Sequence, residues 1–149
     1  EQHHMKPKDT EKLLELLKKS GSIDAYLQEN KDFLLDCEIK EYLNTLKQKK
    51  GYTVAQIAKS AELSEPFCHQ FLSPKNPRLP SRETLLSFCI GMQLNLDEIQ
   101  TALRIAKFAL LYPKDERDSI LIYGIAHQKS VPEINELLYD HQLKCLCEK

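Results

Sequence analysis

The stretch from Thr53 to Ser81, TVAQIAKSAELSEPFCHQFLSPKNPRLPS, decides the expected fold. It predicts two short helices around a tight turn, followed by a loop whose three prolines prevent a helix from continuing. Thr53 is placed to cap the first helix and Ser64 the second. Pro66 fits the first turn of the second helix, where no backbone donor is needed. The spacing is typical of a helix–turn–helix.

Outside this stretch the chain also shows a helical pattern. Apolar residues recur every three or four positions, and almost no strand-like alternation is present. We predict helices that begin at Asp9 or Thr10, at Ser22, at Phe33, at Ser81 and near Leu96. Two more helices are joined at HQKS, where Ser130 caps and Pro132 lies in the first turn. Gly21, the KQKKG run ending at Gly51, and Pro113 mark the breaks. The predicted fold class is all-α.

The same spacing predicts which side chains face a core. For the helix–turn–helix these are Ile57, Ala58, Leu63, Cys68 and Phe71. For the other helices they are Leu13, Leu14, Leu16, Leu17, Ile23, Tyr26, Leu27, Ile39, Tyr42, Leu43, Leu46, Leu85, Leu86, Phe88, Cys89, Met92, Ile99, Leu103 and Ile105. We find no internal repeat strong enough to build on, although the last two helices outline a second helix–turn–helix. The segments LRIAKFALLY and ILIYGIAHQ are apolar enough to pack on the domain or on a second copy.

Composition places the chain among ordinary globular proteins. It has 149 residues, of which 42% are apolar and 29% charged, with a net charge of -1. No segment forms a basic tail, so any phosphate contacts must come from a local patch. The five cysteines are an odd number without framework spacing, which argues against a disulfide scaffold. Cys37, Cys68 and Cys89 are expected to be buried, reduced thiols.

No signal peptide and no apolar run near the ~20 residues of a membrane span is recognisable, so the expected location is cytoplasmic. The opening EQHH before Met5 is typical of a purification-tag remnant, and His3 and His4 are left out of any metal argument.

The order of five helices from about Asp36 to Ala106 resembles the Cro and lambda-repressor (XRE-type) family of helix–turn–helix domains. The segments that carry the resemblance are TVAQIAKSAELS, FLSPKNPRLPSRETL and IGMQLNLDEI. The whole chain is also similar to bacterial regulators of that family with a helical C-terminal extension. With the tag remnant and start Met at 1–5 set apart, the resemblance implies an N-terminal helical extension at 6–35, a helix–turn–helix DNA-binding-like domain of five helices at 36–106, and a C-terminal helical extension, a hairpin, at 107–149.

The resemblance also implies the site. In this family the second helix of the pair lies in the major groove and its first residues meet base edges. Carried over by position, the base-reading residues are Glu65, Pro66, His69 and Gln70, and a glutamine suits adenine. The implied phosphate contacts are Lys49, Lys50, Thr53, Ser64, Lys75, Asn76, Arg78 and Arg82. The implied assembly is a homodimer on a two-fold operator in double-stranded DNA.

The chain departs from the family pattern in ways that leave an alternative open. Val54 replaces a common glutamine, Glu62 stands where the turn often has glycine, and Pro74 replaces a glycine after the reading helix. The reading helix has no Arg or Lys. Phe67, expected to be exposed between Pro66 and His69, suits a protein interface. The alternative function is therefore a protein-binding adaptor that keeps the scaffold without binding DNA.

Other chemistries find little support in the residues. His127, His141, Cys145 and Cys147 do not match the paired spacing of structural zinc sites, and the terminal HQLKCLC is expected to fray. No nucleophile elbow surrounds a serine and no glycine-rich phosphate loop occurs. The acids of PKDERD suit a helix start. We predict no catalytic residues, no metal, no cofactor and no enzyme activity.

Overall fold

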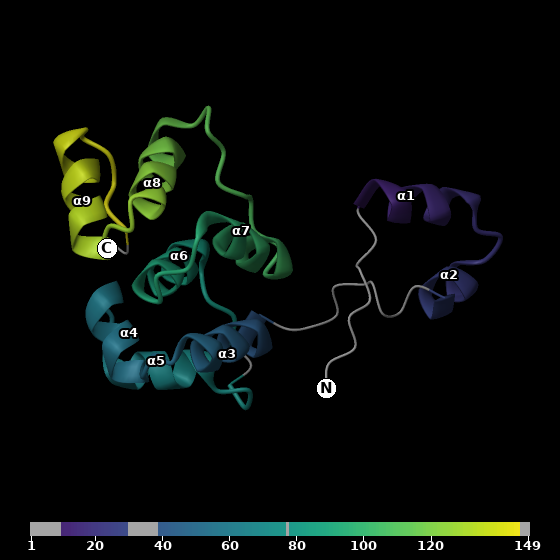
Figure 1. The fold of residues 1–149 in the computed structure, drawn as a ribbon, viewed down its shortest axis with the longest axis horizontal. Coiled ribbons are helices and arrows are strands. Elements are labelled where there is room, and N and C mark those ends of the chain that lie inside the picture. Colours follow the sequence, from purple (N-terminus) through teal and green to yellow (C-terminus); the bar gives the residue numbers. More distant parts are fainter. Residues whose placement is uncertain (1–9, 30–38, 77, 147–149) are drawn as a thin grey trace. The chain divides into compact units, whose positions relative to one another are not determined.

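The computed structural model of the chain describes residues 10–29, 39–76 and 78–146. Within these ranges it contains nine helices and no strand (Figure 1), which confirms the all-α class. The chain divides into two compact units, Glu1–Asp36 and Cys37–Lys149. The tag remnant, the predicted helix start at Phe33, the side chain of Leu27 and Cys37 lie outside the described residues.

The first unit contains α1 (Thr10–Lys19) and α2 (Ile23–Glu29). Tyr26 is buried, and its hydroxyl donates a hydrogen bond to the carbonyl of Leu13 at 3.3 Å. The prediction that Leu14, Leu17 and Ile23 face inward is wrong, since they are 49%, 40% and 58% exposed. Two short helices cover only one side of each other, so part of each apolar face stays open.

The second unit contains α3 (Ile39–Lys50), α4 (Val54–Ala61), α5 (Glu65–Leu72), α6 (Arg82–Gly91), α7 (Leu96–Ile105), α8 (Glu116–Ala126) and α9 (Val131–Asp140). One hydrophobic core runs through all seven helices, so the segment 107–149 belongs to the same compact unit as α3–α7. α4 packs against α5, α6 and α9, and α3 packs against α5 and α7. The predicted core residues of α4 to α7 are buried, except that Leu63 and Ile105 are half-buried.

Local signals explain where these helices begin and end. The side chains of Thr53, Ser64, Ser81 and Ser130 each accept a hydrogen bond from the backbone N–H three residues later, as their N-cap positions require. Gly51 ends α3 in the left-handed conformation, at φ 77°. The predicted caps are therefore confirmed.

α4 and α6 cross at very short range. A Cβ atom added to Gly91 would lie 2.6 Å from the Cβ of Ala61 and 2.9 Å from the carbonyl oxygen of Ile57. Only glycine leaves room for the backbone of α4 at this point. The crossing fixes the position of α4, and with it the position of the helix that follows.

The structure contains an internal repeat, which corrects the expectation from sequence. α6–α7 and α8–α9 repeat at an interval of 35 positions, the separation between Arg82 and Arg117. Both turns have a glutamine in the left-handed conformation, Gln93 and Gln128, each with φ 56°. Both second helices begin with a capping box, formed by Asn95 with Glu98 and by Ser130 with Glu133. Few identical side chains recur, so the repeat is visible mainly in the backbone.

The two halves contact each other reciprocally, as an approximate two-fold relation requires. The guanidinium of Arg82 lies 3.4 Å from the carboxylate of Asp118, and that of Arg117 lies 2.6 Å from the carboxylate of Glu83. Arg82 Nε donates to the carbonyl of Ala109 at 2.9 Å, and Arg117 Nε donates to that of Lys144 at 2.8 Å. Arg82, at the start of α6, thus binds both the segment after α7 and the start of α8. Arg117, at the start of α8, binds both the segment after α9 and the start of α6.

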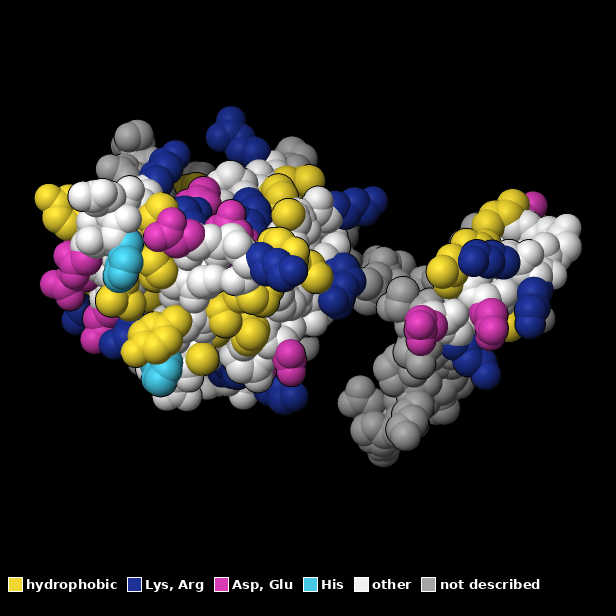
Figure 2. Space-filling model, turned by 90° about the horizontal axis from the view of Figure 1, so that it is seen from above, with side chains coloured by type: hydrophobic (Ala, Val, Ile, Leu, Met, Phe, Trp, Pro, Cys, Tyr) yellow, Lys and Arg dark blue, Asp and Glu magenta, His cyan; other side chains and the backbone are white. Residues whose placement is uncertain are grey.

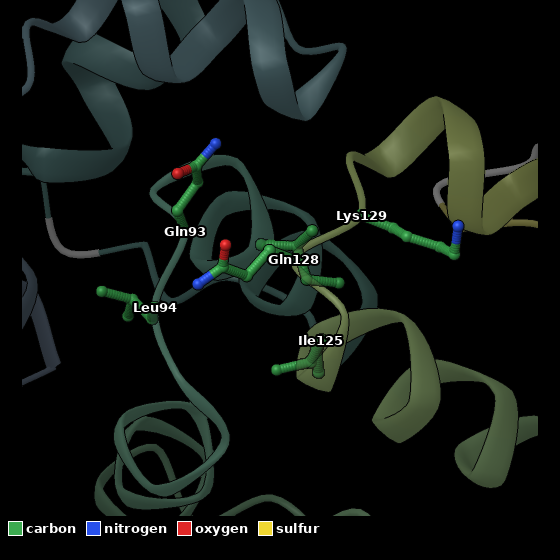
Figure 3. A pocket seen from close by; sticks show the side chains of 6 residues that line it. Gln93, Leu94, Ile125, Gln128 and Lys129 are labelled. Carbon is green, nitrogen blue, oxygen red and sulfur yellow. The ribbon is translucent and has the colours of Figure 1, made fainter.

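The turns of both halves meet at a small cavity on this approximate axis. Its lining consists of three equivalent pairs, Ile90 with Ile125, Gln93 with Gln128, and Leu94 with Lys129. Figure 3 shows the side chains of Gln93 and Gln128 near the cavity, with the Lys129 ammonium directed away. The two halves of the repeat therefore contact each other through their turns as well as through the two arginine–carboxylate pairs.

The expected fraying of the C-terminal tail is wrong for the residues up to Leu146. Leu146 is 4% exposed, and its backbone N–H donates to Asn135 Oδ1 at 2.6 Å. The Cys145 thiol donates to the carbonyl of Asn135 at 3.4 Å. Asn135 and Arg117 satisfy the backbone of this segment from a distance along the chain, which local spacing does not reveal.

Candidate nucleic-acid interface

The helix–turn–helix is formed by α4 and α5. Glu62 takes the left-handed conformation between them, with φ 58° and ψ 41°, and the N–H of Leu63 donates to the carbonyl of Ala58 at 3.0 Å. Ser64 Oγ then accepts from the N–H of Phe67 at 3.2 Å, and Pro66 occupies the first turn of α5. The turn is therefore closed by Glu62, a residue other than glycine in the left-handed conformation.

The inner side of α5 is anchored at several points. Cys68, Phe71 and Leu72 are buried, and the ring of Phe71 lies 4.6 Å from that of Phe88 on α6. Asn44 Nδ2 on α3 donates to the carbonyl of Leu72 at 2.9 Å. These contacts hold α5 as a rigid rod against the core.

Cys68 and Cys89 are buried, free thiols, as expected from sequence. Burial, with a further contribution from the charge of Glu65, raises the pKa of Cys68 to about 11. Burial also raises the pKa of Cys89 strongly. Both therefore stay protonated at neutral pH and act as small apolar side chains.

The outer side of α5 presents the predicted base-reading residues. Glu65, Pro66, His69 and Gln70 are all exposed. Glu65 and His69 lie one helical turn apart with their side chains 3.5 Å from each other. Phe67 is 40% exposed, and its ring stacks on that of Phe71 at 6.0 Å. This side is therefore mixed, with an acid, an imidazole, an amide and an aromatic ring.

The loop after α5 brings cations beside Gln70. Gln70, Ser73, Lys75, Asn76 and Arg78 line one open groove. Asn76 Nδ2 donates to the carbonyl of Gln70 at 3.1 Å, and Asn76 Oδ1 accepts from the N–H of Arg78 at 3.1 Å. Asn76 thus shapes the loop, while Lys75 and Arg78 are exposed.

Lys40 is the residue that sequence reasoning missed. It lies on α3, is 6% exposed, and its ammonium donates to the carbonyl of Ser73 at 3.1 Å and to that of Asn76. It thereby fixes both ends of the segment that carries Lys75. The only signal in the sequence was a lysine next to the apolar stripe of α3, which ordinarily indicates a solvated side chain.

The structure gives the other phosphate candidates different surroundings. Arg82 is engaged with Ala109 and Asp118, and Lys50 pairs with Glu98 at 3.3 Å. Lys49 is exposed. The hydroxyls of Thr53 and Ser64 serve as caps at exposed helix starts. Lys75 and Arg78 are therefore the cations that lie in one groove with a base-reading candidate.

The ion pairs at the start of α6 and α8 have a measurable electrostatic signature. Burial alone would raise the pKa of Glu83, but the hydrogen bond and the charge of Arg117 outweigh it and lower the pKa below its ordinary value. The hydrogen bond to Glu83 raises the pKa of Arg117, against the effect of burial. Both groups are therefore charged at neutral pH.

No group of three or more histidine, cysteine, aspartate or glutamate side chains in the described part of the chain is arranged to hold a metal ion. No helix among those described has the length and apolar character that crossing a membrane requires.

Comparison with known proteins yields no relative. No protein-family model, no curated protein and no solved structure matches the chain. Any functional conclusion therefore depends on the geometry of α5 and its surroundings.

Proposed function

We propose that this chain is a sequence-specific, DNA-binding transcriptional regulator of the Cro and lambda-repressor (XRE) type, cytoplasmic, without enzyme activity, and active as a dimer. α3–α7 would be the five helices of that domain, and α5 the helix that enters the major groove. The observation that carries the proposal is the groove beside α5, where Gln70 lies next to Lys75 and Arg78.

The residues divide into two roles. Gln70 is exposed on α5 and suits bidentate contact with adenine, while Glu65 can accept a hydrogen bond from the cytosine amino group. Lys75 and Arg78 neutralise phosphates from a loop that Lys40 holds in place, and Lys49 adds a cation at the end of α3. Arg82 and Lys50, the other candidate cations, would have to give up ion pairs within the chain, with Asp118 and Glu98, to bind phosphates.

Selection of bound sequences from random double-stranded DNA, followed by gel-shift titration at low and moderate salt, tests the proposal. We expect one enriched half-site in two-fold repeat and an affinity that falls as salt rises. Lys75→Ala weakens binding to every sequence and reduces the slope of log affinity against log salt by about 0.9. Gln70→Ala relaxes preference at one base pair, by about 1–3 kcal/mol.

A matched control is Lys114→Ala, which removes an exposed lysine from the loop between α7 and α8. It should leave both the affinity and the salt slope unchanged. No binding at low salt, or equal losses from Lys114→Ala and Lys75→Ala, would contradict the proposal.

The exposed ring of Phe67 favours a second candidate, a protein-binding adaptor that uses the same helix. Phe67 and Pro66 form an apolar surface on α5, next to the side chains of Glu65 and His69, which lie 3.5 Å apart. This alternative predicts that Phe67→Ala loosens a protein complex without changing the folding of the domain. Tyr112→Ala, which truncates another exposed aromatic ring, is the control in a pull-down. Equal capture of the same partner by parent and Phe67→Ala would exclude it.

A further inference from the structure

The internal repeat makes the surfaces of α6 and α8 directly comparable. On α6 the residues Thr84, Ser87, Phe88 and Gly91 form one side of the helix at three- and four-residue spacing. Helices α4 and α5 cover this side, since Gly91 lies against Ala61 and Phe88 packs on Phe71. Phe88 is accordingly 0% exposed.

The equivalent side of α8, 35 positions later, is uncovered. It consists of Ser119, Ile122, Tyr123 and Ala126, which we call the α8 face. Tyr123 is 50% exposed, Ala126 is exposed, and Ile122 is half-buried. Both helices are apolar on nearly all sides, a pattern typical of helices surrounded by protein. α6 is surrounded, whereas α8 is not.

The repeat also indicates what kind of element covers such a face. On the first half the cover is a helix, α4, which approaches closely because small residues meet at the crossing. α4 packs against α6 and α9, so a cover in the equivalent place would lie against α8 and α7. Figure 2 looks down on the end at which Figure 1 labels α8 and α9, and apolar patches alternate there with side chains of both charges. Lys and Arg side chains do not gather there into one continuous patch, as a phosphate partner would favour.

We propose that the α8 face is a docking surface for the α8 face of a second copy of this chain, with the two helices antiparallel. The face is self-complementary, which a two-fold contact requires: the small Ser119 lies one turn from the large Tyr123. Antiparallel packing sets the ring of Tyr123 over Ser119 of the other copy. The ring of Tyr123 already packs against the ring of His127, with the two ring centroids 4.2 Å apart.

The charges at the two ends of α8 agree with this arrangement. Between Ser119 and Ala126 the face carries no charge, and its acidic residues Asp115 and Glu116 lie at the start of the helix. In the antiparallel pair these two acids lie beside His127 and Ala126 of the second copy, so the acids of the two copies do not oppose each other. The contact involves the second half of the repeat and leaves α5 free. It deepens the proposed function by naming the surface of the expected dimer.

The test is the mass of the full chain, without DNA, across concentrations from about 1 to 300 μM, where small interfaces associate. We expect a monomer–dimer equilibrium for the parent. Tyr123→Lys and Ala126→Arg should each raise the dissociation constant at least tenfold. Tyr139→Lys, at a residue on α9 that is 76% exposed, is the matched control and should change nothing. Thermal melting of each variant at low concentration verifies folding.

Several results would overturn the inference. If the parent stays monomeric throughout the range, the α8 face does not bind a second copy, and a helix from a different protein becomes the candidate partner. A dimer that Tyr123→Lys and Ala126→Arg do not weaken uses another surface. Because no DNA is present and α5 is unchanged, either result leaves the proposed DNA binding untouched, and a failure of DNA binding leaves this measurement unaffected.

Discussion

The crossing of α4 and α6 offers the sharpest test of how the fold positions α5. Replacing Gly91 with alanine adds one methyl group at a place where Ala61 Cβ would be 2.6 Å away and the backbone N of Ala61 and O of Ile57 both 2.9 Å away. Two of these three atoms belong to the backbone. No rotamer change relieves the contact, so α4 has to move away from α6.

The expected cost follows from two opposing effects. Overpacking a well-packed core typically costs about 1–3 kcal/mol. Alanine is a better helix former than glycine by up to about 1 kcal/mol, and less at the last residue of a helix. The steric effect is larger, so we expect Gly91→Ala to destabilise the second unit by about 1–2 kcal/mol. For a unit of this size that lowers Tm by about 3–10 °C.

Thermal and urea unfolding, followed by circular dichroism, measure this change. Gly124→Ala is an informative comparison, because the atoms in its way belong to the buried, β-branched side chain of Ile134 on α9 and not to the backbone of α4. It should also destabilise the unit, but through the packing of α8 on α9, so the position of α4 should stay unchanged. Gly21→Ala is the neutral control, since nothing lies within 4 Å of its added Cβ. If Gly91→Ala melts at or above the parent temperature, the close crossing is not what positions α4 and α5, and the reasoning fails.

Three further outcomes are expected. Glu62→Gly relieves a left-handed residue, at φ 58°, and should stabilise the protein by about 0.5–1 kcal/mol in urea unfolding; a loss of stability would contradict this. Lys40→Met removes the donor to the carbonyls of Ser73 and Asn76, so it should lower the free energy of unfolding by roughly 2–3 kcal/mol and weaken DNA binding. Unchanged stability and binding would show that the loop keeps its conformation without Lys40. Because folding lowers the pKa of Glu83, its contribution to stability is full above the unfolded pKa and is lost as pH falls through the folded value. Unfolding free energies measured from pH 7 to below pH 4.5 should therefore fall less steeply in Glu83→Gln than in the parent.

The sequence alone determined where the helices of the second unit lie and which residues cap four of them. Thr53, Ser64, Ser81 and Ser130 are caps in the structure, and each is recognisable because a cap bonds to a backbone group only three residues away. The inward faces of α4, α6 and α7 were also predictable, because the three- and four-residue spacing of apolar side chains is a local property of the sequence. The exposure of Phe67 was also predictable, since it lies next to the buried Cys68 on α5.

Contacts between distant residues decided the rest. Lys40 holds a loop 33 and 36 positions away, and Arg82 bonds to carbonyls 27 and 28 positions away, so neither role leaves a mark in its local pattern. The docking of Leu146 depends on Asn135, 11 positions earlier. The repeat was hidden for a related reason: its two copies share backbone turns and ion pairs, while their faces differ because one lies under α4 and α5 and the other does not. Spacing along a helix reports which side is apolar, but only the packing of the whole chain determines which apolar sides are already covered.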